Sequence, residues 1–187
     1  MLKTIDFPSV NEQKDILKMA LFYANLGWPV FPVHSVTSEL ICTCKQREDC
    51  SSPGKHPRTI KGLKDASTVP EQIESWWKVQ WPSSNIGVVT GKQSGLFVID
   101  IDPKNDGLSS FEELKNMIAL PETLISITGS GGFHLFFQYP NEEMRNLINL
   151  LPGIDIRAEG GYIVAPPSLH VSGKSYEWKG KENNDSI

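Results

Sequence analysis

The sequence predicts an α+β domain built around a mixed, mainly antiparallel β-sheet with flanking helices. Of its 187 residues, 39% are apolar and 21% are charged, a composition typical of a globular domain with a hydrophobic core. Segments with the pattern of strands outnumber those with helical periodicity, and short turns separate several of them. We expect one domain over residues 1–180, with an irregular loop at about 35–67 and a tail or linker start at 181–187.

Neither a membrane span nor a secretory signal is predicted. No apolar run approaches the roughly 20 residues that a membrane helix needs. The N-terminus, MLKTIDFPSV, also lacks the apolar stretch of a signal peptide. We therefore expect a cytoplasmic protein with no membrane partner. The net charge of −4 argues against a surface that grips nucleic acid everywhere, and leaves open a local basic groove.

Four segments are predicted helices. The first begins with Ser9 and Glu12, which have the spacing of a capping box, and its apolar residues recur at three- and four-residue steps. The second has Pro70 near its first turn, where a missing N–H does no harm. The four helices are expected at residues 9–27, from residue 68 onward, from residue 109 to just before Pro121, and at residues 142–151.

Seven segments are predicted strands. The first contains two prolines, which restrict it to the edge of a sheet. The second and third are expected to pair as a hairpin through a turn at residues 91–95. The seven strands are expected at residues 28–33, 85–90, 96–102, 124–128, 134–139, 154–158 and 162–165.

Two aspartates end the apolar run LFVIDIDP at residues 96–103. Alternate side chains of a strand share a face, so Asp100 and Asp102 point the same way. Two neighbouring like charges repel, and a hard cation such as Mg²⁺ or Mn²⁺ between them removes the repulsion. The alternative is a polar strand end that leads into a turn, and this short pattern alone leaves both open.

The same alternation places Asp155 and Arg157 on one face of a later strand, IDIR. An exposed ion pair between them is the simpler interpretation. The strand lies between Pro152-Gly153 and Gly160-Gly161, and glycines allow a backbone to approach a ligand closely. A third carboxylate for a metal site is therefore the competing hypothesis.

A glycine-rich segment, GSGGFH at residues 129–134, separates two predicted strands. Its N–H groups can face an anion, and His134 begins the next strand close by. The alternative is a hairpin with an incidental histidine. Taken together, three carboxylates, an arginine and this loop are the parts needed to hold a metal-bound triphosphate. In that arrangement Ser130, His134 and Arg157 bind phosphate oxygens, and paired metals about 4 Å apart sit on the carboxylates.

The ordered set of these motifs resembles the primase–polymerase (prim-pol) domain of the archaeo-eukaryotic primase superfamily, of the N-terminal bifunctional DNA primase/polymerase type. DID, SGGFH and GIDIRAEGGYIVAPPS carry the resemblance, together with ALFYANLGWPVFPV, GKHPR and NIGVVTG, over about residues 20–178. Such domains occur in replication proteins of plasmids, phages and other mobile genetic elements. The resemblance implies a catalytic core related to the RNA-recognition (RRM) fold.

The resemblance also implies roles for individual residues. Metal-binding, catalytic carboxylates fall on Asp100, Asp102 and Asp155, and some family members have Glu where this chain has Asp102. Nucleotide binding falls on Ser130, Gly131, Gly132, His134, Arg157, Gly161 and Tyr162.

All three cysteines lie in the irregular loop, where Cys42, Cys44, Cys50 and His56 form the pattern C-x-C-x5-C-x5-H. Zn²⁺ takes four such ligands, but this spacing is not a common zinc-finger pattern. Reduced, unliganded thiols in a flexible loop are the alternative. Some prim-pol domains have a zinc-binding stem in this region, which favours zinc. The loop is also locally basic, and it can reach template or nucleotide phosphates through Lys45, Arg47, Lys55 and Arg58.

These patterns predict a template-directed nucleotidyltransferase, a DNA primase and polymerase, that uses Mg²⁺ or Mn²⁺ to join nucleotides to a 3′-hydroxyl. Its expected partners are nucleoside triphosphates and a single-stranded DNA template with its primer. A helicase or a helical primase domain is a further candidate partner, because relatives often carry one. Two other functions stay open at this point: a non-catalytic module of a larger replication protein that binds nucleotide and single-stranded DNA, and a metal-dependent nuclease.

Overall fold

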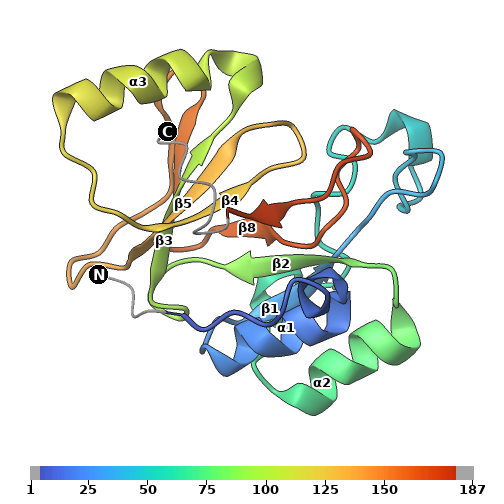
Figure 1. Ribbon diagram of the computed structural model, residues 1–187. Helices are drawn as coiled ribbons and strands as arrows, with labels where there is room; N and C mark the ends of the chain where they lie inside the picture. The colour runs from blue at the N-terminus through green and yellow to red at the C-terminus, as the bar shows by residue number, and fades with distance from the viewer. Residues whose placement is uncertain (1–4, 180–187) are drawn as a thin grey trace.

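The computed structural model describes residues 5–179, which form two antiparallel sheets with helices packed around them (Figure 1). The α-helices are α1 Ile16–Asn25, α2 Pro70–Glu74, which continues as a π-helical segment over Ser75–Gln80, and α3 Gly107–Met117. The strands are β1 Val30–Val33, β2 Asn85–Val89, β3 Leu96–Ile101, β4 Leu124–Ile127, β5 Phe133–Gln138, β6 Leu147–Leu151, β7 Ile154–Arg157, β8 Tyr162–Ala165 and β9 Glu177–Trp178. The predicted α+β class is confirmed. The predicted tail at 181–187 lies outside the described residues.

The smaller sheet has the order β1-β2-β8 and the larger one β6-β7-β3-β5-β4-β9. Every pairing between these strands is antiparallel. As its prolines predict, β1 is an end strand of its sheet. No helix among residues 5–179 has the length and apolar character needed to cross a bilayer.

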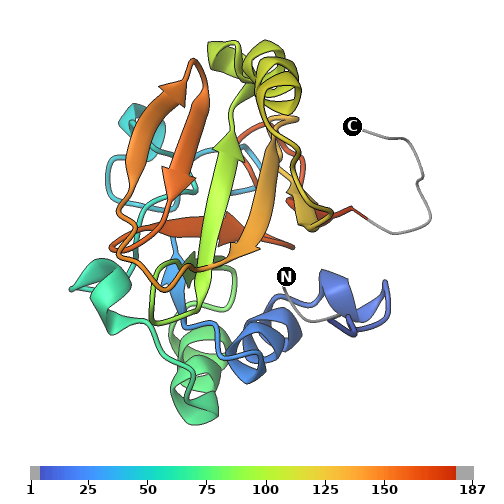
Figure 2. The same ribbon diagram turned by 90° about the vertical axis from the view of Figure 1, so that its left-hand side faces the viewer.

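Four strands of the larger sheet form the expected RRM-like core. Along the chain, β3 leads through α3 to β4, and β5 then returns between them, which gives the spatial order β7-β3-β5-β4. This is the β-α-β-β-α-β arrangement with one change, because β6 takes the place of the second helix. Figure 2 shows β3 at the centre of the sheet, with the β6–β7 hairpin on one side.

The predicted helix at residues 142–151 is therefore wrong. β6 pairs with β7, and Asn149 has φ = 56°, a value that a helix interior excludes. Asn146 uses its side-chain oxygen to accept a hydrogen bond from Ala158 N, at 2.7 Å. Local helical preference is worth only tenths of a kcal/mol per residue, so pairing along the open edge of β7 overrides it.

The predicted hairpin of β2 with β3 is also wrong. The turn itself forms, since Gly91 N donates to Leu96 O at 2.7 Å. Beyond the turn the two strands enter different sheets, because β1 and β8 already flank β2 while β5 and β7 flank β3. The turn residues predicted correctly that the chain reverses direction here. Which strands then pair depends on residues far away in the sequence.

The helix signals are right in kind but shifted in position. Ser9 and Glu12 form the predicted capping contact, with Ser9 Oγ 2.7 Å from Glu12 Oε2, but it closes only a short 3-10 turn over Glu12–Lys14. Asp15 is the true N-cap of α1 and accepts hydrogen bonds from Leu17 N and Lys18 N. α3 begins at Gly107, two residues before the predicted start, and ends before Pro121 as expected.

The two faces of β3 pack against different layers. Ile99 and Ile101 lie in a cluster with Phe111 and Leu114 of α3. On the other face, Leu96 and Val98 pack in a core with residues of α1, α2 and the smaller sheet, among them Ile86, Val88, Ile163 and Ala165. Asp100 shares this second face and follows Val98, so it lies where the apolar contact between the two sheets gives way to an open pocket.

Candidate active site

Asp100 has a polar partner on each side within the sheet. It lies directly opposite His134 of β5 in one strand pairing and directly opposite Asp155 of β7 in the other. His134 Nε2 is 3.4 Å from Asp100 Oδ1. The His134 side chain is only 6% exposed, and its Nδ1 has no hydrogen-bond partner among the described residues. The strand register thus brings three residues together from three segments of the chain.

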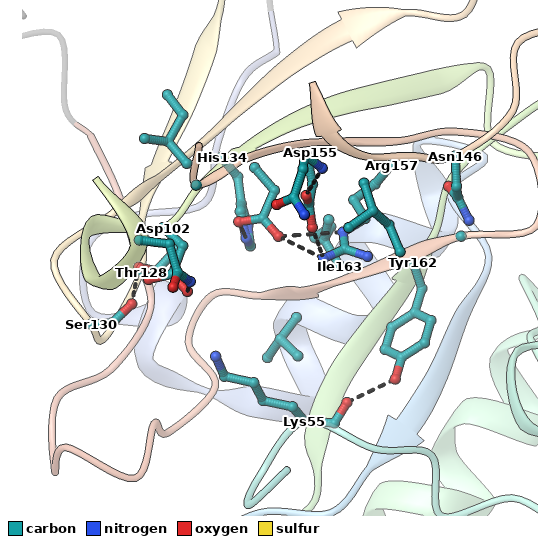
Figure 3. A pocket seen from close by; sticks show the side chains of 18 of the residues that line it. Lys55, Asp102, Thr128, Ser130, His134, Asn146, Asp155, Arg157, Tyr162 and Ile163 are labelled. Atoms are coloured by element: carbon teal, nitrogen blue, oxygen red, sulfur yellow. Dashed lines mark hydrogen bonds and ion pairs between the residues drawn. The ribbon is translucent and has the colours of Figure 1, made fainter. Parts of the chain in front are cut away.

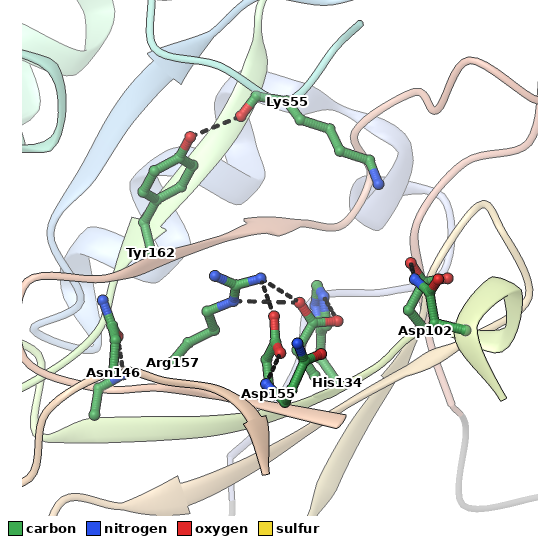
Figure 4. Close-up of polar contacts among 11 residues, drawn as sticks. Lys55, Asp102, His134, Asn146, Asp155, Arg157 and Tyr162 are labelled. Carbon is green, nitrogen blue, oxygen red and sulfur yellow. Dashed lines mark hydrogen bonds and ion pairs between the residues drawn. The ribbon is translucent and has the colours of Figure 1, made fainter. Parts of the chain in front are cut away.

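Arg157 joins the two opposing carboxylates. Its Nη2 lies 3.2 Å from Asp100 Oδ2 and 2.8 Å from Asp155 Oδ2 (Figure 4). Burial alone would raise the pKa of Asp100, but the hydrogen bond and charge of His134, with the charge of Arg157, outweigh it and lower the pKa to about 2. The Asp100 carboxylate is therefore ionised at neutral pH despite its burial.

Asp102 points into the same pocket from a different place. Its backbone N donates to Gly153 O at 2.8 Å, which fixes the end of β3 against the turn before β7. Its carboxylate accepts hydrogen bonds from Lys104 N and from Asn105 Nδ2. Figure 4 shows Asp102 to one side of the group that contains His134, Asp155 and Arg157. The structure thus brings Asp100 and Asp155 into one cluster and places Asp102 beside it.

The pocket between the two sheets has a volume of about 490 Å³, in the range of small-ligand sites (Figure 3). Its lining combines acidic, basic and neutral polar side chains with a few apolar ones. Of the residues predicted to be functional, it is lined by Asp100, Asp102, Asp155, Ser130, His134, Arg157, Gly161 and Tyr162.

Gly131 and Gly132 do not line the pocket. Gly131 N donates to Thr128 O and Gly132 N donates to Thr128 Oγ1, so neither N–H is available to an anion. A Cβ atom at Gly132 would lie 2.0 Å from Ile101 O, which shows that this glycine allows β3 to pass closely. Ser130 of this loop lines the pocket, and its Oγ lies 2.9 Å from Thr128 Oγ1.

Several pocket residues carried no clear signal in the sequence. Asn149 N donates to Asp155 Oδ1 at 2.8 Å and so fixes that carboxylate from β6, the strand mistaken for a helix. Lys55 enters from the irregular loop at residues 35–67 that holds the cysteines and His56, the Cys/His loop, and Tyr162 Oη donates to its carbonyl oxygen at 2.9 Å. The basic character of this loop had indicated phosphate contact for Lys55, but nothing in the sequence placed it in this pocket. Thr128, Asn146 and Tyr176 also line the pocket.

The Cys/His loop gathers its four predicted ligands. The ligand atoms of Cys42, Cys44, Cys50 and His56 all lie within 4.8 Å of one another. Burial raises the pKa of the Cys44 thiol, but hydrogen bonds from Cys42, Gln46 N, His56 and Cys50 outweigh it and lower that pKa to about 6. A thiol that ionises easily among three further nitrogen and sulfur donors can hold a metal ion.

The two groups of residues suit different metals. Asp100, Asp102 and Asp155 all offer oxygen atoms to one pocket, the donor type that Mg²⁺ and Mn²⁺ take in proteins. His56 Nε2 lies 3.6 Å from Cys42 Sγ and 3.5 Å from Cys50 Sγ. Tetrahedral zinc would hold such a nitrogen and sulfur about 3.5 Å apart, so the loop has the right size for it.

Comparison with known proteins identifies the chain's relatives at the level of the family. The model of the family described as bifunctional DNA primase/polymerase, N-terminal, matches residues 20–186, which is most of the chain. A search of curated proteins gave no match. The matched region contains the pocket, its three carboxylates and the Cys/His loop. The chain therefore belongs to the Prim-Pol family, whose members are nucleotidyltransferases of the DNA primase/polymerase type.

Proposed function

We propose that this chain is a template-directed DNA primase and polymerase that joins nucleoside triphosphates to the 3′-hydroxyl of a primer. The observation that carries the proposal is the placement of Asp100 opposite both His134 and Asp155 in one pocket of a Prim-Pol domain. In the reaction, the hydroxyl oxygen forms a bond to the α-phosphorus and loses its proton. The bond from that phosphorus to the β-phosphate oxygen breaks, and pyrophosphate leaves.

Asp100, Asp102 and Asp155 would hold the catalytic Mg²⁺ or Mn²⁺. Such ions supply the positive charge that makes a hydroxyl more acidic and stabilises a leaving pyrophosphate. Two backbone contacts support this role. Asn149 N fixes the Asp155 carboxylate, and Gly153 O fixes the backbone of Asp102. Positions held in this way need little reorganisation when a cation is bound.

Arg157, His134 and Ser130 would bind phosphate oxygens of the incoming nucleotide. Arg157 can do so once a cation replaces it between the two carboxylates, because its guanidinium is then free to pair with phosphate. Gly161 and Tyr162 form the wall of the same pocket and would contact the nucleotide there. The anion cradle is formed by side chains more than by the glycine-rich backbone, because Gly131 and Gly132 donate within their own loop.

We also propose that the Cys/His loop binds one structural zinc ion. The donor set is three cysteines and one histidine, and the separations from His56 Nε2 to Cys42 and Cys50 match tetrahedral coordination. No exchangeable water ligand is needed with four protein ligands, so this ion would serve folding of the loop and not the reaction.

A primer-extension assay tests the proposed activity. Purified protein is given a primed single-stranded DNA template, each type of nucleoside triphosphate in turn, and Mg²⁺ or Mn²⁺. We expect extension that Asp100→Asn and Asp155→Asn abolish while circular dichroism shows an intact fold. Glu113→Gln on the exposed side of α3 is the control and should retain activity. Extension that persists in either aspartate variant would refute the assignment.

The same samples separate the two alternatives. Degradation of DNA without added nucleotide would identify a nuclease. Binding of nucleotide and single-stranded DNA without incorporation would identify a non-catalytic module. De novo priming is assayed separately without a primer, because initiation is the step for which a helical primase domain or helicase would be the expected partner.

A further inference from the structure

Lys55 brings a positive charge from the Cys/His loop into the candidate active site. It lines the same pocket as Asp100 and Ser130, although 45 and 75 positions separate it from them in sequence. Figures 3 and 4 show its side chain on the wall opposite Arg157 and Asp155, with the ammonium directed toward the side where Asp102 lies. Within residues 5–179 this ammonium has no ion-pair or hydrogen-bond partner, unlike the guanidinium of Arg157.

The backbone of Lys55 is held from two directions. Tyr162 Oη of β8 donates to its carbonyl oxygen at 2.9 Å. The next residue, His56, belongs to the proposed metal cluster, and its own carbonyl accepts a hydrogen bond from His34 N at the end of β1. The backbone of Lys55 is therefore fixed both to β8, which lines the pocket, and to the Cys/His cluster, while its side chain extends into the pocket.

The charge balance of the pocket leaves Lys55 available to pair with a negatively charged ligand. Among the described lining residues, the permanent cations are Arg157 and Lys55, and Arg157 already serves two carboxylates. A triphosphate brings several negative charges, which concentrate on its β- and γ-phosphates. Lys55 also lies near the glycine-rich loop. The side chain of His170 packs directly on Gly129 of that loop. Burial lowers the pKa of His170 most, and the nearby charge of Lys55 is the next largest cause.

We propose that Lys55 binds the terminal phosphates of the incoming nucleoside triphosphate and that the metal-bound Cys/His loop holds it in place to do so. The inference rests on the proposed function, and it assigns the loop a part in substrate binding. The loop is then more than a stabilising element, because metal binding at one site sets nucleotide affinity at another. An ordinary solvent-exposed lysine is the competing explanation, and it predicts no effect on nucleotide binding.

Equilibrium binding of a deoxynucleoside triphosphate tests the proposal without turnover. Calorimetry with Ca²⁺ in place of Mg²⁺ compares wild-type protein with Lys55→Ala, Lys55→Arg and Lys64→Ala. Lys64 is the matched control because it is also an exposed lysine of the irregular loop at residues 35–67, but it does not line the pocket. Zinc content and thermal unfolding of each variant are measured on the same samples.

We expect Lys55→Ala to weaken triphosphate binding about tenfold, the loss expected for one charge-assisted hydrogen bond in a solvent-accessible site. Binding of the matching monophosphate should change little. Lys55→Arg should recover most of the affinity, and Lys64→Ala should behave as wild type. All four proteins should contain the same amount of zinc.

A double-mutant cycle tests the link to the cluster. Cys50→Ser, which removes a proposed zinc ligand, should weaken triphosphate binding by a similar factor, and Lys55→Ala should add little in its presence. Full additivity would show that the loop does not act through Lys55. Wild-type affinity in Lys55→Ala, with primer extension present in the wild type, would refute the role of Lys55 and leave the proposed function standing. A wild type that neither binds nor extends would refute both.

Discussion

Asp100 and Asp155 face each other directly across β3 and β7, and both carboxylates bind the same guanidinium, that of Arg157. Two carboxylates at this separation repel each other unless a cation lies nearby. Arg157 supplies that positive charge in the structure. A divalent metal ion at the site proposed above would compete with Arg157 for the same negative charge, and the first prediction tests this competition.

Arg157→Ala should strengthen metal binding and weaken nucleotide binding. Removal of the guanidinium frees both carboxylates for a cation, so we expect Mn²⁺ to bind about tenfold more tightly by calorimetry. In the presence of a chelator, the same variant should lose about 2 kcal/mol of unfolding free energy because the carboxylates then repel each other, and Mn²⁺ should restore it. Triphosphate affinity should fall.

The control for that experiment is Arg145→Ala. The Arg145 side chain is 81% exposed, and its one ion pair within residues 5–179 is with Glu143 at the surface, so its removal should change neither metal affinity nor stability. Equal Mn²⁺ affinity in Arg157→Ala and wild type would show that the arginine does not compete with the metal.

Protein purified without chelator should contain about one zinc ion per chain, and Cys50→Ser should lose it. Elemental analysis by mass spectrometry measures the ratio. Because metal binding contributes to folding free energy, chelator should lower the melting temperature of the wild type and leave that of Cys50→Ser unchanged. Ser51→Ala, next to Cys50 and exposed, is the control. Absence of zinc from the wild type would rule out the site.

Unfolding free energy should decrease as pH falls from about 6.5 toward 4. Burial, with the nearby charges of Lys55 and Lys104, lowers the pKa of His170 from 6.5 to about 4, despite the opposing effect of Asp102. Between these values the unfolded chain binds a proton that the folded protein does not, so acid favours unfolding. Urea titrations at several pH values measure the unfolding free energy at each pH. In His170→Asn this free energy should depend less steeply on pH than in the wild type. An unchanged slope would contradict the prediction.

Gly132→Ala should destabilise the protein by about 3 kcal/mol. The added Cβ would lie 2.0 Å from Ile101 O and 2.8 Å from Pro103 Cδ, so the end of β3 must shift. Gly131→Ala tests the local backbone alone, because its φ is +86° and no heavy atom lies within 4 Å of an added Cβ. It should cost about 1 kcal/mol. Similar losses in the two variants, measured by urea unfolding, would disprove the close approach.

Much of the local structure could be predicted from the sequence. The alternation of residues in LFVIDIDP and IDIR predicted correctly which side chains share a face, because the two-residue period belongs to the strand itself. The spacing of the cysteines and His56 predicted a cluster, because all four lie within 15 residues of one loop. The two failures have different causes. At residues 142–151 the chain forms a hairpin with the strand that follows it, whereas the partners of β2 and β3 lie far along the chain.

The kinds of chemical group and their order along the chain could be read from the residues alone: three carboxylates, a histidine, an arginine and a cysteine-rich loop. Folding in three dimensions was needed to place His134 and Asp155 on either side of Asp100, to bring Arg157 to both acids, and to bring Lys55 of the loop to the same pocket. Side-chain direction follows from local backbone geometry, whereas neighbours across a sheet are selected by the burial of the whole chain.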